Sequence, residues 1–200
     1  MSESYDEKKE NIKKTALQVF ARYGYYKTTM DDIAEGVGIK KNSLYYYFPN
    51  KESLFEEILR EESEKMFNNV KEEVSKIESV EKKIRMFFRE FHCYGRKNKQ
   101  NYSISIDKMI EFGQVVDEYF NEYYNVVLQM LKEILDEGSQ SGELKKIDTE
   151  KTASTMLKFI SSYQREEIRK NRKQSFETFD FEKMENEVEG LLSMIINGIK

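Results

Sequence analysis

The sequence predicts an all-α fold in two parts: a small N-terminal domain with a helix-turn-helix over residues 1–50, and a larger helical domain over residues 51–200. Three observations support this prediction. The 200 residues include one Pro and nine Gly, which leaves little room for the turns of a sheet protein. Apolar residues recur at helical spacing along most of the chain. Charged residues make up 35% of the chain and hydrophobic residues 38%, a balance typical of amphipathic helices with solvated faces.

Two N-terminal helices follow from apolar spacing and from a helix cap. The first carries its apolar face on Ile12, Ala16, Leu17 and Phe20. The second is expected to begin near Thr29, because Thr29 followed three residues later by Asp32 resembles a capping box, with an acid in place of the usual Glu or Gln. Its apolar stripe consists of Met30, Ile33, Ala34 and Val37. This spacing predicts a helix of about two turns with one buried face.

A glycine turn leads from the second helix to a third, tyrosine-rich helix. Residues 36–38 end the second helix, because Gly adopts the left-handed conformation that reverses the chain, and Ile39 can fold back as an apolar anchor. Leu44 and Phe48 lie four residues apart and are expected to face inward. Pro49 ends this helix, because the residue before a proline is biased away from the helical region.

Several short motifs occur in one register within this region. They are Gly24, Thr28 with Thr29, Ile33 with Ala34, Gly38 with Ile39, SLYYYF at 43–48 and NKESL at 50–54. With them, residues 8–58 resemble the TetR family of transcriptional regulators. The resemblance implies a DNA-reading helix-turn-helix followed by a helical domain for effector binding and dimerisation. Two positions depart from the family: Lys40 replaces a small hydroxyl residue that usually caps the recognition helix, and Asn42 replaces a small residue such as Gly.

The charge distribution is compatible with DNA binding although the net charge is -4. Through Asn50 the chain has eight Lys and Arg against seven Asp and Glu, whereas the rest has 25 against 30. Affinity for a duplex comes largely from neutralising phosphates. The acidic excess therefore lies mainly away from the expected reading surface.

Geometry and the resemblance together assign DNA-binding roles. The N-terminal residues of a recognition helix reach base edges, so Lys40, Lys41, Asn42 and Ser43 are the candidates for direct readout. Tyr45, Tyr46 and Tyr47 can contact thymine methyl groups and phosphates. The resemblance implies that Tyr47 and Lys51 hold the DNA backbone, and Thr29 can do so from a helix N-terminus. The alternative for the tyrosines is packing against the first helix, and Tyr46 is the most ambiguous of the three.

The pattern of the larger domain predicts long helices over about 50–76, 80–97, 102–111, 114–137, 149–170 and 181–199. Asn50, Asp148 and Asp180 are the expected N-caps. Residues 138–142 form the clearest loop, and the Gly-Glu-Leu step at 142–144 resembles the break that precedes the last two helices in the family.

The last two helices carry stripes expected of a dimer interface. The predicted interface residues are Met156, Ile160, Tyr163, Val188, Leu191, Leu192 and Ile195. Two helices from each subunit would form a four-helix interface, the arrangement that the family resemblance implies. The alternative is that both stripes are buried within one chain.

The middle of the chain is rich in aromatic residues and methionine, and the family resemblance implies a pocket for an apolar small molecule between these helices. The candidate pocket residues are Phe88, His92, Tyr102, Met109, Phe112, Tyr123, Met156 and Phe159. The alternative for each is ordinary core packing. The many tyrosines and few arginines favour a largely apolar or aromatic effector.

Catalysis, cofactors and metals are not expected. His92 and Cys93 are adjacent in a predicted helix, so their side chains point about 100° apart. The single cysteine excludes an intramolecular disulfide and a cysteine-cluster metal site. No apolar run is long enough to span a bilayer and the N-terminus is too charged for a signal peptide, so a cytoplasmic location is expected.

The resulting hypothesis is a sequence-specific transcriptional regulator. It would be a homodimeric repressor that binds a palindromic double-stranded DNA operator and is released by a small-molecule effector. The alternative is a helical scaffold or ligand-binding protein whose reading head no longer works.

Overall fold

The structure is a computed structural model that describes residues 4–97, 110–111, 114–115, 121–174 and 178–200. Its numbered helices are α1 (Tyr5–Tyr23), α2 (Met30–Val37), α3 (Lys41–Tyr47), α4 (Lys51–Ser75), α5 (Val80–Lys97), α7 (Asn121–Ser141), α8 (Thr149–Lys170) and α9 (Phe181–Ile199). Residues 110–111 and 114–115 are short helical pieces. The all-α prediction is confirmed, since every secondary-structure element in these ranges is a helix.

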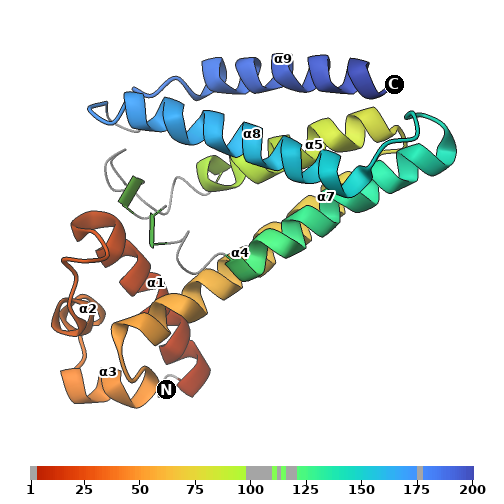
Figure 1. Cartoon of the computed structure of the whole chain (residues 1–200). Helices are drawn as coiled ribbons and strands as arrows, with labels where there is room; N and C mark the ends of the chain where they lie inside the picture. The colour runs from red at the N-terminus through yellow and green to blue at the C-terminus, as the bar shows by residue number, and fades with distance from the viewer. Residues whose placement is uncertain (1–3, 98–109, 112–113, 116–120, 175–177) are drawn as a thin grey trace.

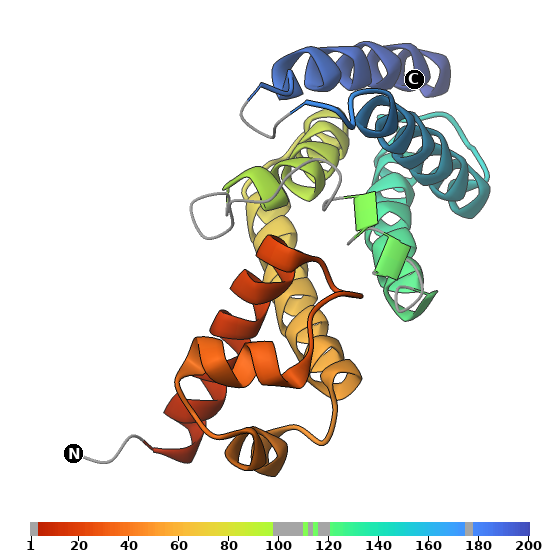
Figure 2. The ribbon, with the colours of Figure 1, turned by 90° about the vertical axis from the view of Figure 1, so that its left-hand side faces the viewer.

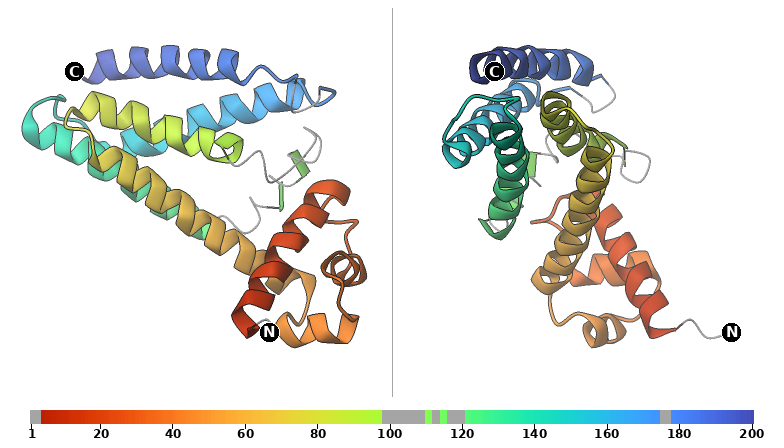
Figure 3. Two further views of the ribbon diagram at one scale, coloured as in Figure 1. Left: turned by 180° about the vertical axis from the view of Figure 1, so that it is seen from behind. Right: turned by 90° about the vertical axis from the view of Figure 1, so that its right-hand side faces the viewer.

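The helices form two groups joined by one long helix. α1, α2 and α3 lie together at one end of the molecule, and α5, α7, α8 and α9 form a bundle at the other (Figure 1). α4 leaves the first group beside α1 and runs to α5, against which it packs (Figure 2). α9 is the outermost helix and lies on the far side of the molecule from α3 (Figure 3). The group of α1, α2 and α3 therefore lies at the opposite end of the molecule from α9.

The N-terminal helices share a core with the first turns of α4. Phe20, Ile33 and Leu44 are fully buried there, together with Leu54 of α4. Val115, from one of the short helical pieces, is buried in the same cluster. The predicted boundary at residue 50 falls at the N-cap of α4, and the residues after it complete the core of the first group.

Charged side chains fix α1 on α4. The Nζ of Lys9 lies 2.8 Å from a Glu57 carboxylate oxygen, and that of Lys13 lies 2.5 Å from Oε1 of Glu61. Lys13 is nearly buried and also pairs with Glu10. Burial lowers the pKa of Lys13, but its hydrogen bonds to Glu10 and Glu61 outweigh this, so the pKa is raised. These ion pairs thus hold the ammonium group of Lys13 in place between α1 and α4.

The helix caps expected from the sequence are confirmed. Thr29 and Asp32 form the capping box at the start of α2. Side chains of Asn50, Asp148 and Asp180 accept backbone N–H hydrogen bonds at the starts of α4, α8 and α9. A cap depends on residues three apart, so the local sequence is sufficient to specify it.

The loop predicted at residues 138–142 is corrected, because α7 continues through Gly138 to Ser141. A Cβ on Gly138 would lie 2.6 Å from Leu144 Cδ1 and 2.8 Å from Val80 Cγ1. Gly138 therefore permits Leu144 and Val80 to approach the backbone of α7 closely. The chain reverses at Gly142, whose φ is 79°. The helix predicted near residues 102–111 lies almost entirely outside the described ranges.

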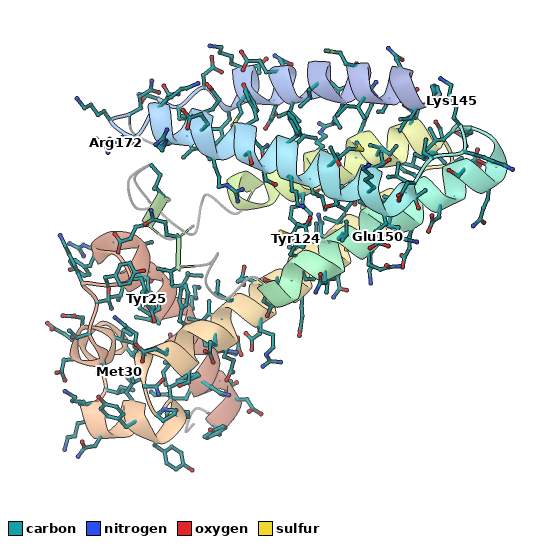
Figure 4. The ribbon with its side chains drawn as sticks, viewed as in Figure 1. Tyr25, Met30, Tyr124, Lys145, Glu150 and Arg172 are labelled. Carbon is teal, nitrogen blue, oxygen red and sulfur yellow. The ribbon has the colours of Figure 1, made fainter. Side chains whose placement is uncertain are left out.

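The bundle core is formed by α4, α5, α7, α8 and α9. Tyr124 of α7 and Ser154 of α8 share a hydrogen bond of 3.1 Å between their hydroxyls (Figure 4). Lys145, after α7, donates its backbone N–H to the carbonyl of Ile199 at 2.8 Å and so holds the end of α9 (Figure 4). Within the described residues, no helix is long and apolar enough to cross a membrane.

Candidate nucleic-acid interface

The turn between α2 and α3 has the geometry of a helix-turn-helix. Gly38 adopts the left-handed conformation with φ 75°, and its N–H donates to the carbonyl of Glu35 at 3.0 Å. The N–H of Ile39 donates to the carbonyl of Ala34, also at 3.0 Å. Leu44 and Phe48 are buried and anchor α3 to the core. The remaining face of α3 is left for solvent or DNA.

The four residues predicted to read bases are brought together and are all exposed. Lys40 is the N-cap residue of α3, and its side chain makes no cap hydrogen bond. Lys41, Asn42 and Ser43 follow in the first turn. The Nζ of Lys41 donates to Oδ2 of Asp31 at 2.6 Å, and this hydrogen bond raises the pKa of Lys41. One of the two lysines predicted to read bases is therefore partly neutralised by an acid on α2.

The three tyrosines of α3 differ in what they contact. Tyr45 and Tyr46 are exposed, and Tyr46 is 74% exposed. Tyr47 is half-buried and stacks on Tyr5 of α1, with ring centroids 4.8 Å apart. Tyr46 and Tyr5 form a T-shaped pair with ring centroids 5.9 Å apart. Packing against the first helix thus applies mainly to Tyr47, the residue that the family resemblance assigns to the DNA backbone.

Thr29 is exposed at the N-terminus of α2, but its hydroxyl already has two hydrogen-bond partners. It accepts from the N–H of Asp32 at 3.3 Å and donates to Oδ2 of Asp32 at 2.6 Å. The hydroxyl and the backbone N–H of Thr29 both donate to Oδ2 of Asp32, and these two hydrogen bonds lower the pKa of Asp32, so the carboxylate is the stable form. Thr29 therefore fixes the start of α2 and, through it, the direction of that helix N-terminus.

Lys51 is half-buried and bound to the backbone of the α1–α2 connection. Its Nζ donates to the carbonyl oxygens of Tyr25 at 2.9 Å and Thr28 at 3.0 Å. An ammonium group has three donors, so one donor and the charge remain for a phosphate. Lys51 is thus a structural residue of the domain as well as a candidate for DNA contact.

Described members of the predicted effector pocket do not all gather in one place. Phe88 and Met156 are buried in the bundle core, and Tyr123 packs against Phe67 with ring centroids 5.9 Å apart. Phe159 is 65% exposed, so it belongs to the outer surface of α8 and not with Phe88 and Met156. The side chain of His92 and the residues Tyr102, Met109 and Phe112 lie outside the described part of the chain.

The predicted dimer residues fall into two sets. Met156, Ile160, Val188 and Leu192 are buried inside the chain itself, whereas Tyr163, Leu191 and Ile195 are half-buried. Sequence reasoning missed Met194, which is 73% exposed. Phe159 lies at one edge of the apolar stripe of α8, and Met194 lies at one edge of the stripe of α9. Helical periodicity identifies such edge residues but does not say which edge of a stripe faces solvent.

Comparisons with known proteins agree with this geometry. Residues 12–58 match the family model described as "Bacterial regulatory proteins, tetR family". The chain is 31% identical over 157 residues to the uncharacterized HTH-type transcriptional regulator YhgD of Bacillus subtilis, covering 76% of this chain and 80% of that one. It is 46% identical over 52 residues to the biofilm operon icaADBC HTH-type negative transcriptional regulator IcaR of Staphylococcus aureus, covering 26% of this chain and 28% of IcaR.

A solved structure shows the same fold over the whole chain. It is the transcriptional regulator FadR of Bacillus subtilis in complex with stearoyl-CoA, with a TM-score of 0.72 and 22% identity. The match covers 96% of this chain and 99% of that one. A helix-turn-helix joined to a larger helical bundle defines a DNA-binding transcriptional regulator. The chain belongs to the TetR family.

Proposed function

We propose that this regulator is a repressor that binds a palindromic operator as a homodimer. The first turn of α3 carries the proposal: it presents four adjacent polar side chains to solvent while Leu44 and Phe48 hold the helix from behind. One such unit contacts too few base pairs for specificity, so two must read successive half-sites. IcaR, which matches over the reading head, is named a negative regulator, and this supports repression.

The dimer would form through the outer faces of α8 and α9. Phe159 and Met194 are large apolar side chains exposed on these two helices, and Leu191 and Ile195 are half-buried beside Met194. Exposed apolar side chains on neighbouring helices support burial against a second copy in a four-helix interface. The buried members of the predicted set would then hold the interface helices in place from inside the chain.

A small, largely apolar or aromatic effector would release the repressor. FadR, which shares the fold, is described in complex with stearoyl-CoA, and this supports a ligand-responsive regulator. The effector would favour a state in which the two recognition helices no longer match successive major grooves. The regulator would act in the cytoplasm, by binding alone and without catalysis.

The short helical pieces at 110–111 and 114–115 support communication between the two parts. Oε1 of Glu111 accepts the N–H of Tyr26 at 3.3 Å, and Val115 is buried in the N-terminal core. Ile110 packs against Phe179 and Met184 near the α8–α9 connection. A shift of the larger domain would therefore reach the α1–α2 connection directly.

The test is a selection of genomic duplexes bound by the full chain, followed by titration of the selected operator and a random duplex. The parent should prefer the operator. Asn42→Ala should lose about 1–3 kcal/mol of that preference, because Asn can bond both N7 and N6 of adenine, and keep its affinity for the random duplex.

Equal affinity of the parent for operator and random duplex would contradict the proposal. That result would favour the scaffold with a non-functional reading head. Phe88→Ala, in the bundle core and remote from α3, controls for a general loss of stability.

A further inference from the structure

A cavity of about 510 Å³ lies between α5, α8 and α9. α5 and α9 run one above the other on the face seen in Figure 3, left. Its volume falls within the range of about 300–1,000 Å³ typical of small-molecule sites. Apolar side chains of Met86 and Phe88 on α5 and of Val188 and Leu192 on α9 form part of its wall. It shares Phe88 with the pocket predicted from the sequence.

Gln164 of α8 lines the cavity and has no hydrogen-bond partner within the described residues. Gln164 is 8% exposed, so the residue is more than nine-tenths buried. A buried amide without partners is unfavourable, and such groups in native proteins usually meet a ligand or water. The amide both donates and accepts, so it can orient a polar group that enters the cavity.

Three cations of α5 border the cavity at helical spacing. Arg85 is held by Glu81 at 2.9 Å, by Ser193 at 3.1 Å and by Glu189. Lys82 and Arg89 are exposed and make no ion pair within the described ranges. The acids at the cavity are Glu189, matched by Arg85, and Glu185, which has another interaction. Two uncompensated cations therefore stand at the rim of an apolar cavity.

We propose that this cavity binds a small amphipathic anion. Its apolar body would lie against Phe88 and Leu192, and its carboxylate would be bound by Arg89 and Lys82 and oriented by the amide of Gln164. The binding site is inferred from the cavity and its lining residues and does not depend on the proposed function. Its role as the effector site rests on the proposed function, because α9 also carries the proposed dimer face and a ligand beneath it would change how that face is presented.

The binding test uses calorimetry of the full chain with decanoate, decanol and acetate as probes. Decanoate should bind saturably and at least about tenfold more tightly than either of the others, because decanol lacks the charge and acetate lacks the apolar body. Decanol binding as tightly as decanoate, or no saturable binding of decanoate, overturns the site.

Variants then separate binding from folding. Gln164→Leu should weaken decanoate about tenfold and leave the melting temperature unchanged or raised, because it removes a buried unpaired amide. Arg89→Gln should weaken decanoate likewise. Arg172→Gln, an exposed arginine outside the cavity (Figure 4), should have no effect. Unchanged decanoate affinity in both cavity variants overturns the assignment.

Operator titration with and without decanoate tests the regulatory role. A loss of operator affinity with decanoate in the parent, but not in Gln164→Leu, supports the effector site. Saturable binding without any change in operator affinity overturns that role and leaves the binding site intact. If the parent prefers no operator, the proposed function fails, and calorimetry still decides the site.

Discussion

The ammonium group of Lys51 donates to the Tyr25 carbonyl and also lies over the ring of the same tyrosine, 4.4 Å from its centroid. Tyr25 is buried and packs against Phe20 and Phe55, so this contact ties α4 to the core behind α2. A residue that the family resemblance assigns to the DNA backbone is thus also built into the domain.

Lys51→Met should lower the free energy of unfolding by about 2 kcal/mol, because hydrogen bonds from a charged donor to two carbonyls are lost. Affinity for DNA falls as the salt concentration rises, and the slope of log K against log[salt] should become less steep by about 0.9, the value for one phosphate contact. Denaturant unfolding and titrations at several salt concentrations measure the two effects. Lys27→Met removes an exposed charge nearby as a control. Lower stability with an unchanged salt slope would show that Lys51 is structural alone.

The Asp31–Lys41 pair should weaken DNA binding in the parent chain. Asp31→Asn frees Lys41 and removes an acid from the reading surface, so affinity for operator and random duplex should rise severalfold, measured by fluorescence anisotropy. Glu35→Gln removes one charge from the same helix without freeing Lys41. An equal gain in both variants would show that only net charge matters.

Glu57 should contribute to acid stability. Burial raises the pKa of Glu57, but Lys9 and Lys13 outweigh this and hold the pKa below its ordinary value of 4.5. The contribution is therefore present above pH 4.5 and is lost as pH falls through the lowered pKa of the folded state. Glu57→Gln should cost about 1 kcal/mol at neutral pH and nothing at the acid end.

Denaturant unfolding across the acid range checks this expectation. Glu56→Gln, a neighbouring exposed carboxylate, is the matched control and should leave the pH dependence unchanged. A parallel downward shift for Glu57→Gln at every pH would show that its effect is due to packing and not to charge.

Gly138→Ala should destabilise the chain by about 1–2 kcal/mol, because the new Cβ would overlap Leu144 and Val80, both buried. On an open helix face the same change usually stabilises by up to about 1 kcal/mol. Gly190→Ala, where nothing lies within 4 Å of the new Cβ, provides that comparison. Thermal unfolding that shifts upward for both variants would contradict the close approach.

Phe159→Glu and Met194→Glu should convert a dimer to a monomer, because each places a charge in the proposed apolar interface. Size-exclusion chromatography with light scattering measures the mass. Tyr23→Glu changes an exposed aromatic residue on α1 and should leave the dimer intact. A monomeric parent, or dimeric variants, would place the interface elsewhere or exclude it.

The sequence by itself determined the N-terminal helices, the caps of α2 and α4, and which face of α3 is exposed. These features depend on residues three or four apart: Thr29 with Asp32, Leu44 with Phe48, and Asn50 with Ser53. Gly38 is likewise a local device, since a left-handed residue at the end of α2 is sufficient to turn the chain.

Only the tertiary structure decided which apolar residues are inside. Met156 and Phe159 lie on one helix and were grouped together in the sequence, but the first is buried and the second faces solvent. Periodicity gives the angle between side chains, whereas burial depends on which helices pack around them. The sequence likewise could not predict the contact of Gly138 with Val80 or the cavity at Gln164, because each brings together segments distant in sequence.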